Sequence, residues 1–144
     1  MGGQDSAPQP VETLLAAWMG CTQATAMFVG RQLRSNDRPR GIRIVRLEFD
    51  TIEGFRDERG ALELPIDVTP TIPSRLQRIT GTIRVVTSSN HSLSVGGRSS
   101  PPLSEEQLRV LKEQTEARCP VANMILSSGC AVDVDWVSTT DEVV

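Results

Sequence analysis

The sequence predicts a single α+β domain over residues 1–144, with a long helix first, strands next, and two further helices before a last strand. Three observations carry this prediction. Residues 10–32 are apolar over a span typical of a helix, shorter segments alternate apolar and polar residues with a period of two, and a helix-capping motif begins at Ser104. No internal repeat interrupts this order, and a chain of this length can bury one hydrophobic core.

The first expected element is the helix over residues 10–32. Pro10 suits a first helical turn, Glu12 complements the positive end of the helix dipole, and Arg31 complements the negative end. Residues at steps of three and four form one stripe with a cysteine at its middle: Leu14, Trp18, Cys21, Thr25 and Phe28. Because few residues of this helix are polar on any side, we expect it to lie inside the domain.

The strand-like segments follow this helix and also end the chain. The apolar residues of the first segment change parity at Ile44 and Val45, which predicts a β-bulge. Residues 53–74 contain two glycines and three prolines among charges, so we expect a hairpin or loop excursion with at most edge strands around residues 61–68. The three predicted strands cover residues 42–50, 79–85 and 130–136.

Two helices are expected between the second and third strands. Ser104 and Gln107 have the spacing of a capping box, in which each side chain satisfies a backbone N–H of the other residue. The helix that starts there runs to about residue 117. Pro120 cannot continue this helix but is well placed to open another, which Gly129 ends.

Composition and charge exclude several classes of function. A net charge of -3 argues against general affinity for nucleic acid or for an anionic membrane surface. No apolar run reaches the roughly 20 residues that span a bilayer, and no charged leader precedes an apolar segment, so we expect a cytoplasmic protein. In a reducing compartment three cysteines are expected to be free, redox-active or metal-binding rather than a structural framework, and with one histidine and no Cys-x-x-Cys pair the indication of a metal site is weak.

The three cysteines have different surroundings in the sequence. Helix N-termini and neighbouring cations lower the pKa of a thiol, and Cys119 has both a predicted helix start and Arg118 beside it. Cys21 lies in the middle of a helix, where it is equally well explained as a small packing residue or as a nucleophile. Cys130 shares the parity of the apolar residues in the last strand, which favours a place in the core.

Two motifs resemble one known family. Residues 2–17 followed by Gly20-Cys21-Thr22 resemble the central-helix signature of the OsmC/Ohr family, the osmotically inducible and organic-hydroperoxide-resistance proteins. Cys119-Pro120-Val121, which follows a predicted helix, resembles the second cysteine motif of that family. The two motifs occur in the family's order, and the likeness covers essentially the whole chain.

This resemblance implies a fold and an activity. The fold would be a strongly curved antiparallel sheet wrapped around two central helices, in an intertwined homodimer. The activity would be that of a thiol peroxidase that needs no metal or other cofactor and acts on organic hydroperoxides. In the family's scheme Cys21 becomes a sulfenic acid, Cys119 condenses with it to a disulfide, and an external dithiol reduces that disulfide.

The resemblance is incomplete in two places. Family members usually carry preceding strands and an activating arginine within them, and we expect this chain to lack that segment. The glutamate that the family places ten residues before the first cysteine is replaced by Val11, with Glu12 one place later. We therefore expect Arg98 or Arg118 to activate Cys21, with Glu12 holding that arginine in place.

Two other functions compete with the peroxidase. One is a family member that keeps the fold but acts as a redox sensor or as a small-molecule-binding protein. The other is an interaction module whose cysteines only pack the dimer. The rate at which hydroperoxides oxidise the thiols separates the first function from both alternatives.

Overall fold

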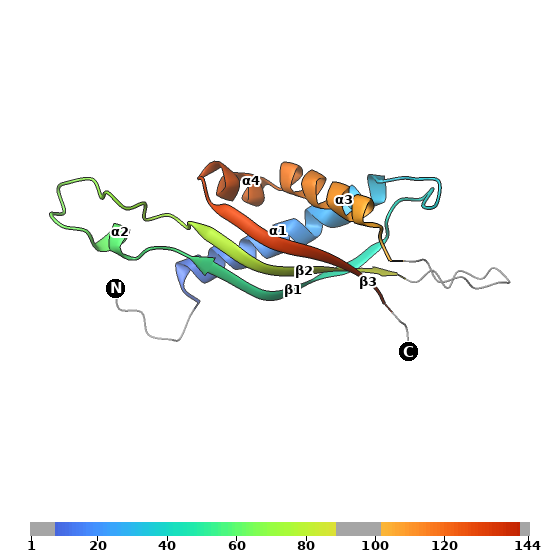
Figure 1. Cartoon of the computed structure of the whole chain (residues 1–144), viewed down its shortest axis with the longest axis horizontal. Helices are drawn as coiled ribbons and strands as arrows, with labels where there is room; N and C mark the ends of the chain where they lie inside the picture. Colours follow the sequence, from blue (N-terminus) through green and yellow to red (C-terminus); the bar gives the residue numbers. More distant parts are fainter. Residues whose placement is uncertain (1–7, 89–101, 142–144) are drawn as a thin grey trace.

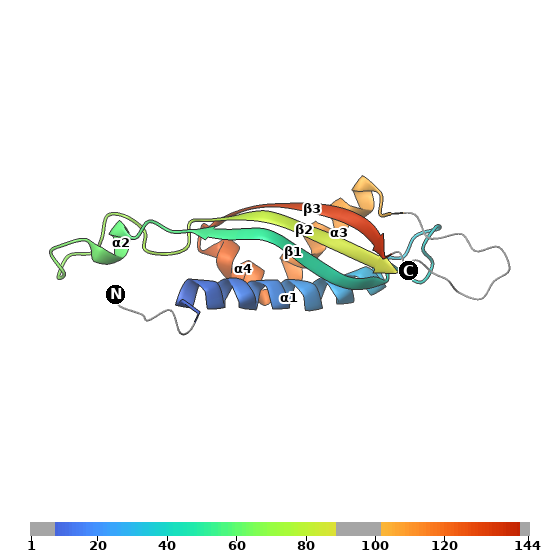
Figure 2. The same cartoon turned by 90° about the horizontal axis from the view of Figure 1, so that it is seen from below.

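The structure is a computed structural model that describes residues 8–88 and 102–141. Three helices, α1, α3 and α4, lie on one face of a three-stranded sheet (Figure 1, Figure 2). This arrangement confirms the predicted α+β class. The elements in chain order are α1 (Pro10–Gln32), β1 (Ile44–Phe55), α2 (Arg59–Leu62), β2 (Arg78–Ser88), α3 (Glu105–Arg118), α4 (Pro120–Ser127) and β3 (Ala131–Asp141).

The sheet is mixed, with the strand order β1-β2-β3. β1 and β2 pair antiparallel, whereas β2 and β3 pair in parallel, with Ile79 beside Val132 and Ile83 beside Trp136. The expectation of an antiparallel sheet is therefore wrong for the second pair. The reason is the connection: α3 and α4 carry the chain back across one face of the sheet, and such a crossover makes the next strand parallel. The strands curve over the helices, as Figure 2 shows.

α1 has the predicted bounds but is not buried on every side. Its buried residues are Trp18, Thr22, Ala26, Val29 and Gly30. Leu14 and Phe28 are 39% and 53% exposed, and Cys21 is half-buried. The prediction that this helix lies inside the domain is therefore wrong for its outer flank, because the sheet, α3 and α4 cover only one side of the helix. Within the described residues, nothing covers the flank that carries Leu14 and Phe28.

β1 contains the predicted bulge and a second one. The pairing register shifts between Ile44 and Arg46, which confirms the expected irregularity. It shifts again between Asp50 and Glu53, where Thr51 takes a φ of 48°. Gly81 of β2 lies under this second bulge with a φ of 140°, and a Cβ there would stand 2.6 Å from the Ile52 side chain. The bulge therefore requires glycine at position 81.

The helices after β2 begin where the sequence predicts. Ser104 Oγ accepts a hydrogen bond from the Gln107 N–H at 3.2 Å, and Gln107 Oε1 accepts one from the Ser104 N–H at 3.1 Å. Leu111 and Thr115 are fully buried against the core and form the inner face of α3. Together with Pro120, which opens α4, these residues fix the position of the chain around Cys119.

The segment between β1 and β2 forms a projecting arm, which we define as residues 56–77 (Figure 1). The edge strands expected around residues 61–68 are absent, and the single-turn helix α2 is the only regular element described there. Its prolines remove backbone donors that a strand would need. Within residues 8–88 and 102–141, no helix is both long enough and apolar enough to cross a membrane.

Replacing Gly81 by alanine should destabilise the fold by about 2–4 kcal/mol. The new Cβ would lie 2.6 Å from the Ile52 side chain and 2.8 Å from the Thr51 carbonyl oxygen. The backbone at position 81 also has a conformation that alanine avoids. The measurement is urea denaturation followed by circular dichroism. The control is Thr82→Ala, on the same strand without such contacts, for which we expect less than about 1 kcal/mol. Equal losses in the two variants would contradict this account of the bulge.

Candidate active site

Two thiols from distant parts of the chain meet in the helix layer. Cys21 lies in the middle of α1, and Cys119 lies at the junction of α3 and α4, 98 residues later. The Sγ atoms are 2.9 Å apart, with Cys119 as hydrogen-bond donor and Cys21 as acceptor. Since α1 packs against both α3 and α4, the pair is held by the packing of three helices.

Cys119 is the buried member of the pair. Its side chain has no solvent exposure, and its Sγ caps α4 by accepting a hydrogen bond from the Ala122 N–H at 3.4 Å. Burial raises the pKa of the Cys119 thiol, and donating its proton to Cys21 raises it further. Cys119 therefore remains a protonated thiol beside Cys21.

The pKa of the Cys21 thiol is shifted in the opposite direction, below its ordinary value. Burial raises the pKa of the Cys21 thiol, but hydrogen bonds from the Cys119 thiol, the Val121 backbone N–H and the Thr25 side chain outweigh burial and lower that pKa. Val121 belongs to the first turn of α4, so this helix presents its N-terminal end to the thiol of α1. A half-buried thiol with these donors favours the thiolate, which is the nucleophilic form of cysteine.

The structure confirms the predicted helix start at Pro120, but this helix start lowers the pKa of Cys21 rather than that of Cys119. The sequence places Cys119 directly before α4, so the lowered pKa was expected there. In the structure burial dominates at Cys119, and the N-terminal end of α4 acts on Cys21 across the helix interface. No local pattern could reveal this, because it depends on how α1 packs against α4. The sequence pattern places Thr25, four residues after Cys21, on the same stripe of the helix but does not indicate that its side chain donates to the thiol.

The expected activating arginine does not stand beside Cys21 in the described residues. The groups that shift the pKa of Cys21 include no arginine. Arg118 is exposed and donates to the Gln114 side chain, while Arg98 lies outside the described residues. Hydrogen bonds to neutral and backbone groups therefore account for the lowered pKa of Cys21.

Glu12 also lies away from the thiols. Its carboxylate accepts a hydrogen bond from the Gln9 N–H at 2.8 Å and so closes the capping box of α1. It stands nine residues before Cys21, a distance of about 13 Å along a helix. In this structure Glu12 stabilises the start of α1 rather than contacting either Cys21 or Arg118.

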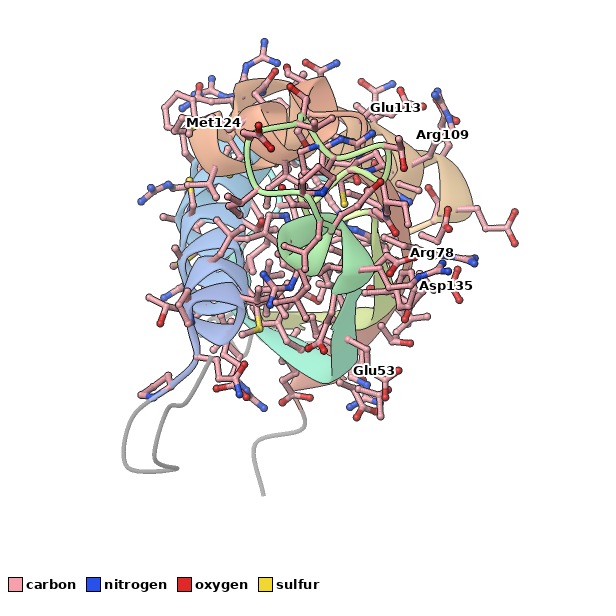
Figure 3. All side chains as sticks on the ribbon, turned by 90° about the vertical axis from the view of Figure 1, so that its left-hand side faces the viewer. Glu53, Arg78, Arg109, Glu113, Met124 and Asp135 are labelled. Atoms are coloured by element: carbon pink, nitrogen blue, oxygen red, sulfur yellow. The ribbon has the colours of Figure 1, made fainter. Side chains whose placement is uncertain are left out.

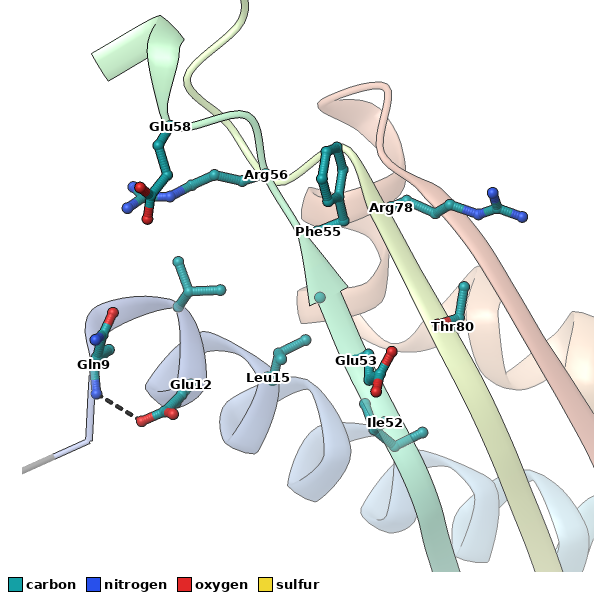
Figure 4. A pocket seen from close by; sticks show the side chains of 12 residues that line it. Gln9, Glu12, Leu15, Ile52, Glu53, Phe55, Arg56, Glu58, Arg78 and Thr80 are labelled. Atoms are coloured by element: carbon teal, nitrogen blue, oxygen red, sulfur yellow. Dashed lines mark hydrogen bonds between the residues drawn. The ribbon is translucent and has the colours of Figure 1, made fainter. Parts of the chain in front are cut away.

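A cavity of about 540 Å³ opens beside Glu12, between the first turns of α1 and the end of β1 (Figure 4). Its apolar part includes Val11, Leu15 and Phe55, and Arg56 lies on its rim. No sequence motif indicated this cavity. Neither cysteine of the pair lines it, so it is separate from the thiol site.

Cys130 occupies the core position that its parity predicts. It is 4% exposed at the start of β3, and burial raises the pKa of its thiol. In the part of the chain that the structure describes, no cluster of three or more histidine, cysteine or acidic side chains is placed to hold a metal ion. The contact between Cys21 and Cys119 offers the chemistry of a nucleophilic sulfur with a second thiol beside it.

Solved structures show a similar fold at low sequence identity. An OsmC-like protein from Mycoplasma pneumoniae is 18% identical with a TM-score of 0.55, over 98% of this chain and 79% of that one. A hypothetical protein from Aquifex aeolicus VF5 is 13% identical with a TM-score of 0.57, over 96% and 79% of the two chains. The organic hydroperoxide resistance protein OhrB of Bacillus subtilis is 15% identical with a TM-score of 0.48, over 94% and 73%.

Sequence comparison covers nearly the whole chain. A search of curated proteins found none that matches it. The profile of the OsmC-like protein family, however, matches residues 3–135, a span that contains both cysteine motifs and every described helix. The chain therefore belongs to the OsmC-like protein family.

Proposed function

We propose that this protein is a thiol peroxidase that reduces organic hydroperoxides with Cys21 and Cys119. The observation that carries the proposal is the 2.9 Å contact between the two Sγ atoms, in which the half-buried sulfur has the lowered pKa. A thiolate that a hydroperoxide can reach and a protonated thiol next to it are the two groups that this reaction needs.

The reaction has two steps on the protein. The Cys21 thiolate attacks the distal oxygen of the hydroperoxide, the O–O bond breaks, and the products are Cys21 sulfenic acid and an alkoxide, which takes a proton to become the alcohol. The Cys119 sulfur then attacks the Cys21 sulfur, forms a disulfide and releases the hydroxyl as water. Because a disulfide bond is about 2.05 Å long, this second step needs a sulfur movement of only about 1 Å.

An external reductant completes the catalytic cycle. An external dithiol reduces the disulfide by thiol–disulfide exchange and returns both cysteines to their thiol forms. No step requires a metal or an organic cofactor. A cytoplasmic location would suit this cycle, because it keeps the resting thiols reduced.

We further propose that the functional unit is a homodimer. Leu14, Phe28 and Met124 are 39%, 53% and 72% exposed on the helix layer around Cys21. A row of exposed apolar side chains along one surface is typical of interaction sites. A second copy placed there would also shield the half-buried Cys21 thiol from solvent.

One observation favours a different function. No arginine is among the groups that lower the pKa of Cys21 in the described residues. A slower thiol pair of this kind suits a redox sensor or a small-molecule-binding protein, in which Cys21 and Cys119 report on oxidants rather than turn them over. The oxidation rate decides between these functions.

Reduced protein should react with tert-butyl and cumene hydroperoxides far faster than free cysteine does, as measured by stopped-flow fluorescence of its tryptophans. Cys21→Ser should lower the rate at least a thousandfold, because it removes the nucleophile. Cys119→Ser should retain the first oxidation but accumulate the sulfenic acid. A wild-type rate no greater than that of free cysteine would exclude the peroxidase and leave the sensor.

The rate of Cys21 alkylation by iodoacetamide should rise with pH through a midpoint below the ordinary cysteine value of about 8.5, because the lowered pKa makes thiolate available at lower pH. Cys119→Ala removes a donor to that thiolate and should raise the midpoint by about one pH unit. Cys130→Ala is the matched control and should leave it unchanged. A midpoint that Cys119→Ala does not move would contradict the role of the thiol contact.

Mild oxidation should join Cys21 to Cys119 and leave Cys130 reduced, since only the first two sulfur atoms are in contact and Cys130 is buried in the core. Mass spectrometry of non-reduced peptides gives the pairing. A disulfide that contains Cys130 would overturn the assignment of roles.

A further inference from the structure

The cavity beside the first turns of α1 has the size of a small-molecule site. Its volume of about 540 Å³ falls within the range of about 300–1,000 Å³ that is typical of ligand pockets. One water molecule occupies only about 30 Å³ in the liquid, so a single ion or water would leave most of this space unfilled. The cavity is therefore large enough for an organic molecule.

Close packing between α1 and β1 forms the base of the cavity. Leu15 lies over Gly54, where a Cβ would stand 3.1 Å from the Leu15 side chain and 3.1 Å from that of Leu76. The backbone of Gly54 is also paired with Ile79 of β2. Because a larger residue at position 54 would push Leu15 away, this contact sets the spacing between the helix and the sheet. The two walls of the cavity are thus present before any ligand binds.

One part of the lining is apolar. Val11 and Leu15 are four residues apart on α1 and so share one face of the helix, while Ile52 and Phe55 belong to β1 (Figure 4). Phe55 is 60% exposed. A ligand with an apolar body would remove this side chain and its neighbours from water, which is favourable.

The charged part of the lining is mainly acidic. It consists of three carboxylates and two guanidinium groups, those of Glu12, Glu53, Glu58, Arg56 and Arg78. Within residues 8–88 and 102–141, none of the three carboxylates forms an ion pair. The Glu12 carboxylate accepts a hydrogen bond from the Gln9 N–H, which leaves its charge in place.

Arg78 does not compensate these carboxylates. Its Nε lies 2.8 Å from Oδ2 of Asp133 on β3, with which it forms an ion pair. Figure 4 shows the Arg78 side chain pointing away from α1, and Figure 3 shows it on the side of the molecule opposite this helix. Three carboxylates therefore face Arg56 alone, and the electrostatic potential in the cavity is negative.

We propose that this cavity binds an amphipathic organic cation, that is, an apolar body that carries an amine or guanidinium group. Glu53 and Glu58 accept hydrogen bonds from the cationic group, and the apolar lining covers the body of the molecule. The site is distinct from the thiol pair. Leu15 precedes Cys21 by six residues, a distance of about 9 Å along the helix.

Other classes of ligand match this lining less well. An organic anion would meet one guanidinium group, that of Arg56, among three carboxylates of its own sign. An inorganic cation would leave the apolar lining uncovered, and in the described ranges no three histidine, cysteine or acidic side chains are placed to hold a metal ion. A neutral apolar molecule would gain nothing from the carboxylates.

Three ligands with the same eight-carbon chain separate these classes. Octylammonium is positively charged near neutral pH, octanol is neutral and octanoate is negatively charged. Titration of the ¹⁵N-labelled full chain, followed by NMR, should show octylammonium binding about tenfold more tightly than octanol and no saturable binding of octanoate. The backbone amides that shift should be those of residues 9–15 and 52–56.

Two results of these titrations would overturn the inference. One is an affinity for octylammonium no greater than that for octanol or octanoate. The other is a set of shifted amides that lies outside the cavity lining.

Charge substitutions of opposite sign test the role of the carboxylates. Glu53→Gln combined with Glu58→Gln should weaken octylammonium binding about tenfold and leave octanol binding unchanged. Both side chains are exposed, so this double variant should fold. Arg56→Gln removes the cation that faces the carboxylates and should strengthen octylammonium binding severalfold, a gain that misfolding cannot produce.

Glu113→Gln is the matched control for the loss of a carboxylate. Glu113 lies on α3, at the opposite end of the view from Glu53 in Figure 3, and its replacement should leave octylammonium binding unchanged. A double variant of Glu53 and Glu58 that binds octylammonium as tightly as the wild type does would contradict the proposed role of these carboxylates. Weaker binding by Arg56→Gln would contradict it as well.

Discussion

The contact between Cys21 and Cys119 is the interaction on which the site depends. It exists only because α1 packs against the junction of α3 and α4, and that junction is fixed by the buried Leu111 and Thr115 and by the helix start at Pro120. The sulfur atoms are in contact because α3 ends and α4 begins at Cys119, which faces α1. The short link between α3 and α4 is as important to the site as the cysteines themselves.

The same contact makes the two thiols unequal. Full burial keeps the proton on Cys119, and that proton then stabilises a thiolate on Cys21. The first turn of α4 adds a backbone N–H from Val121 to the same sulfur. Two chemically identical groups thus acquire different pKa values from burial and donor geometry, and no cation of the described residues contributes to either shift.

Local signals predicted the elements well, and tertiary contacts explain what the sequence missed. The bounds of α1, the capping box at Ser104 and the bulge after Ile44 each depend on a few neighbouring residues, so the sequence was sufficient for them. The parallel pairing of β3 depends on the path of α3 and α4 across the sheet. The thiols' pKa order depends on which helix faces which sulfur, and periodicity carries no information about that.

α1 carries apolar residues on its buried side and also on its exposed side. A helix that is buried on one side usually carries polar residues on its exposed side. On the exposed side of α1, however, lie Leu14 and Phe28. In the proposed reaction an organic molecule must reach the Cys21 thiol, so this thiol cannot be sealed in the core, and polar side chains around it would leave it solvated by water. An apolar flank on a half-buried helix keeps the thiol accessible to an organic molecule and limits its solvation by water, provided that another surface covers this flank.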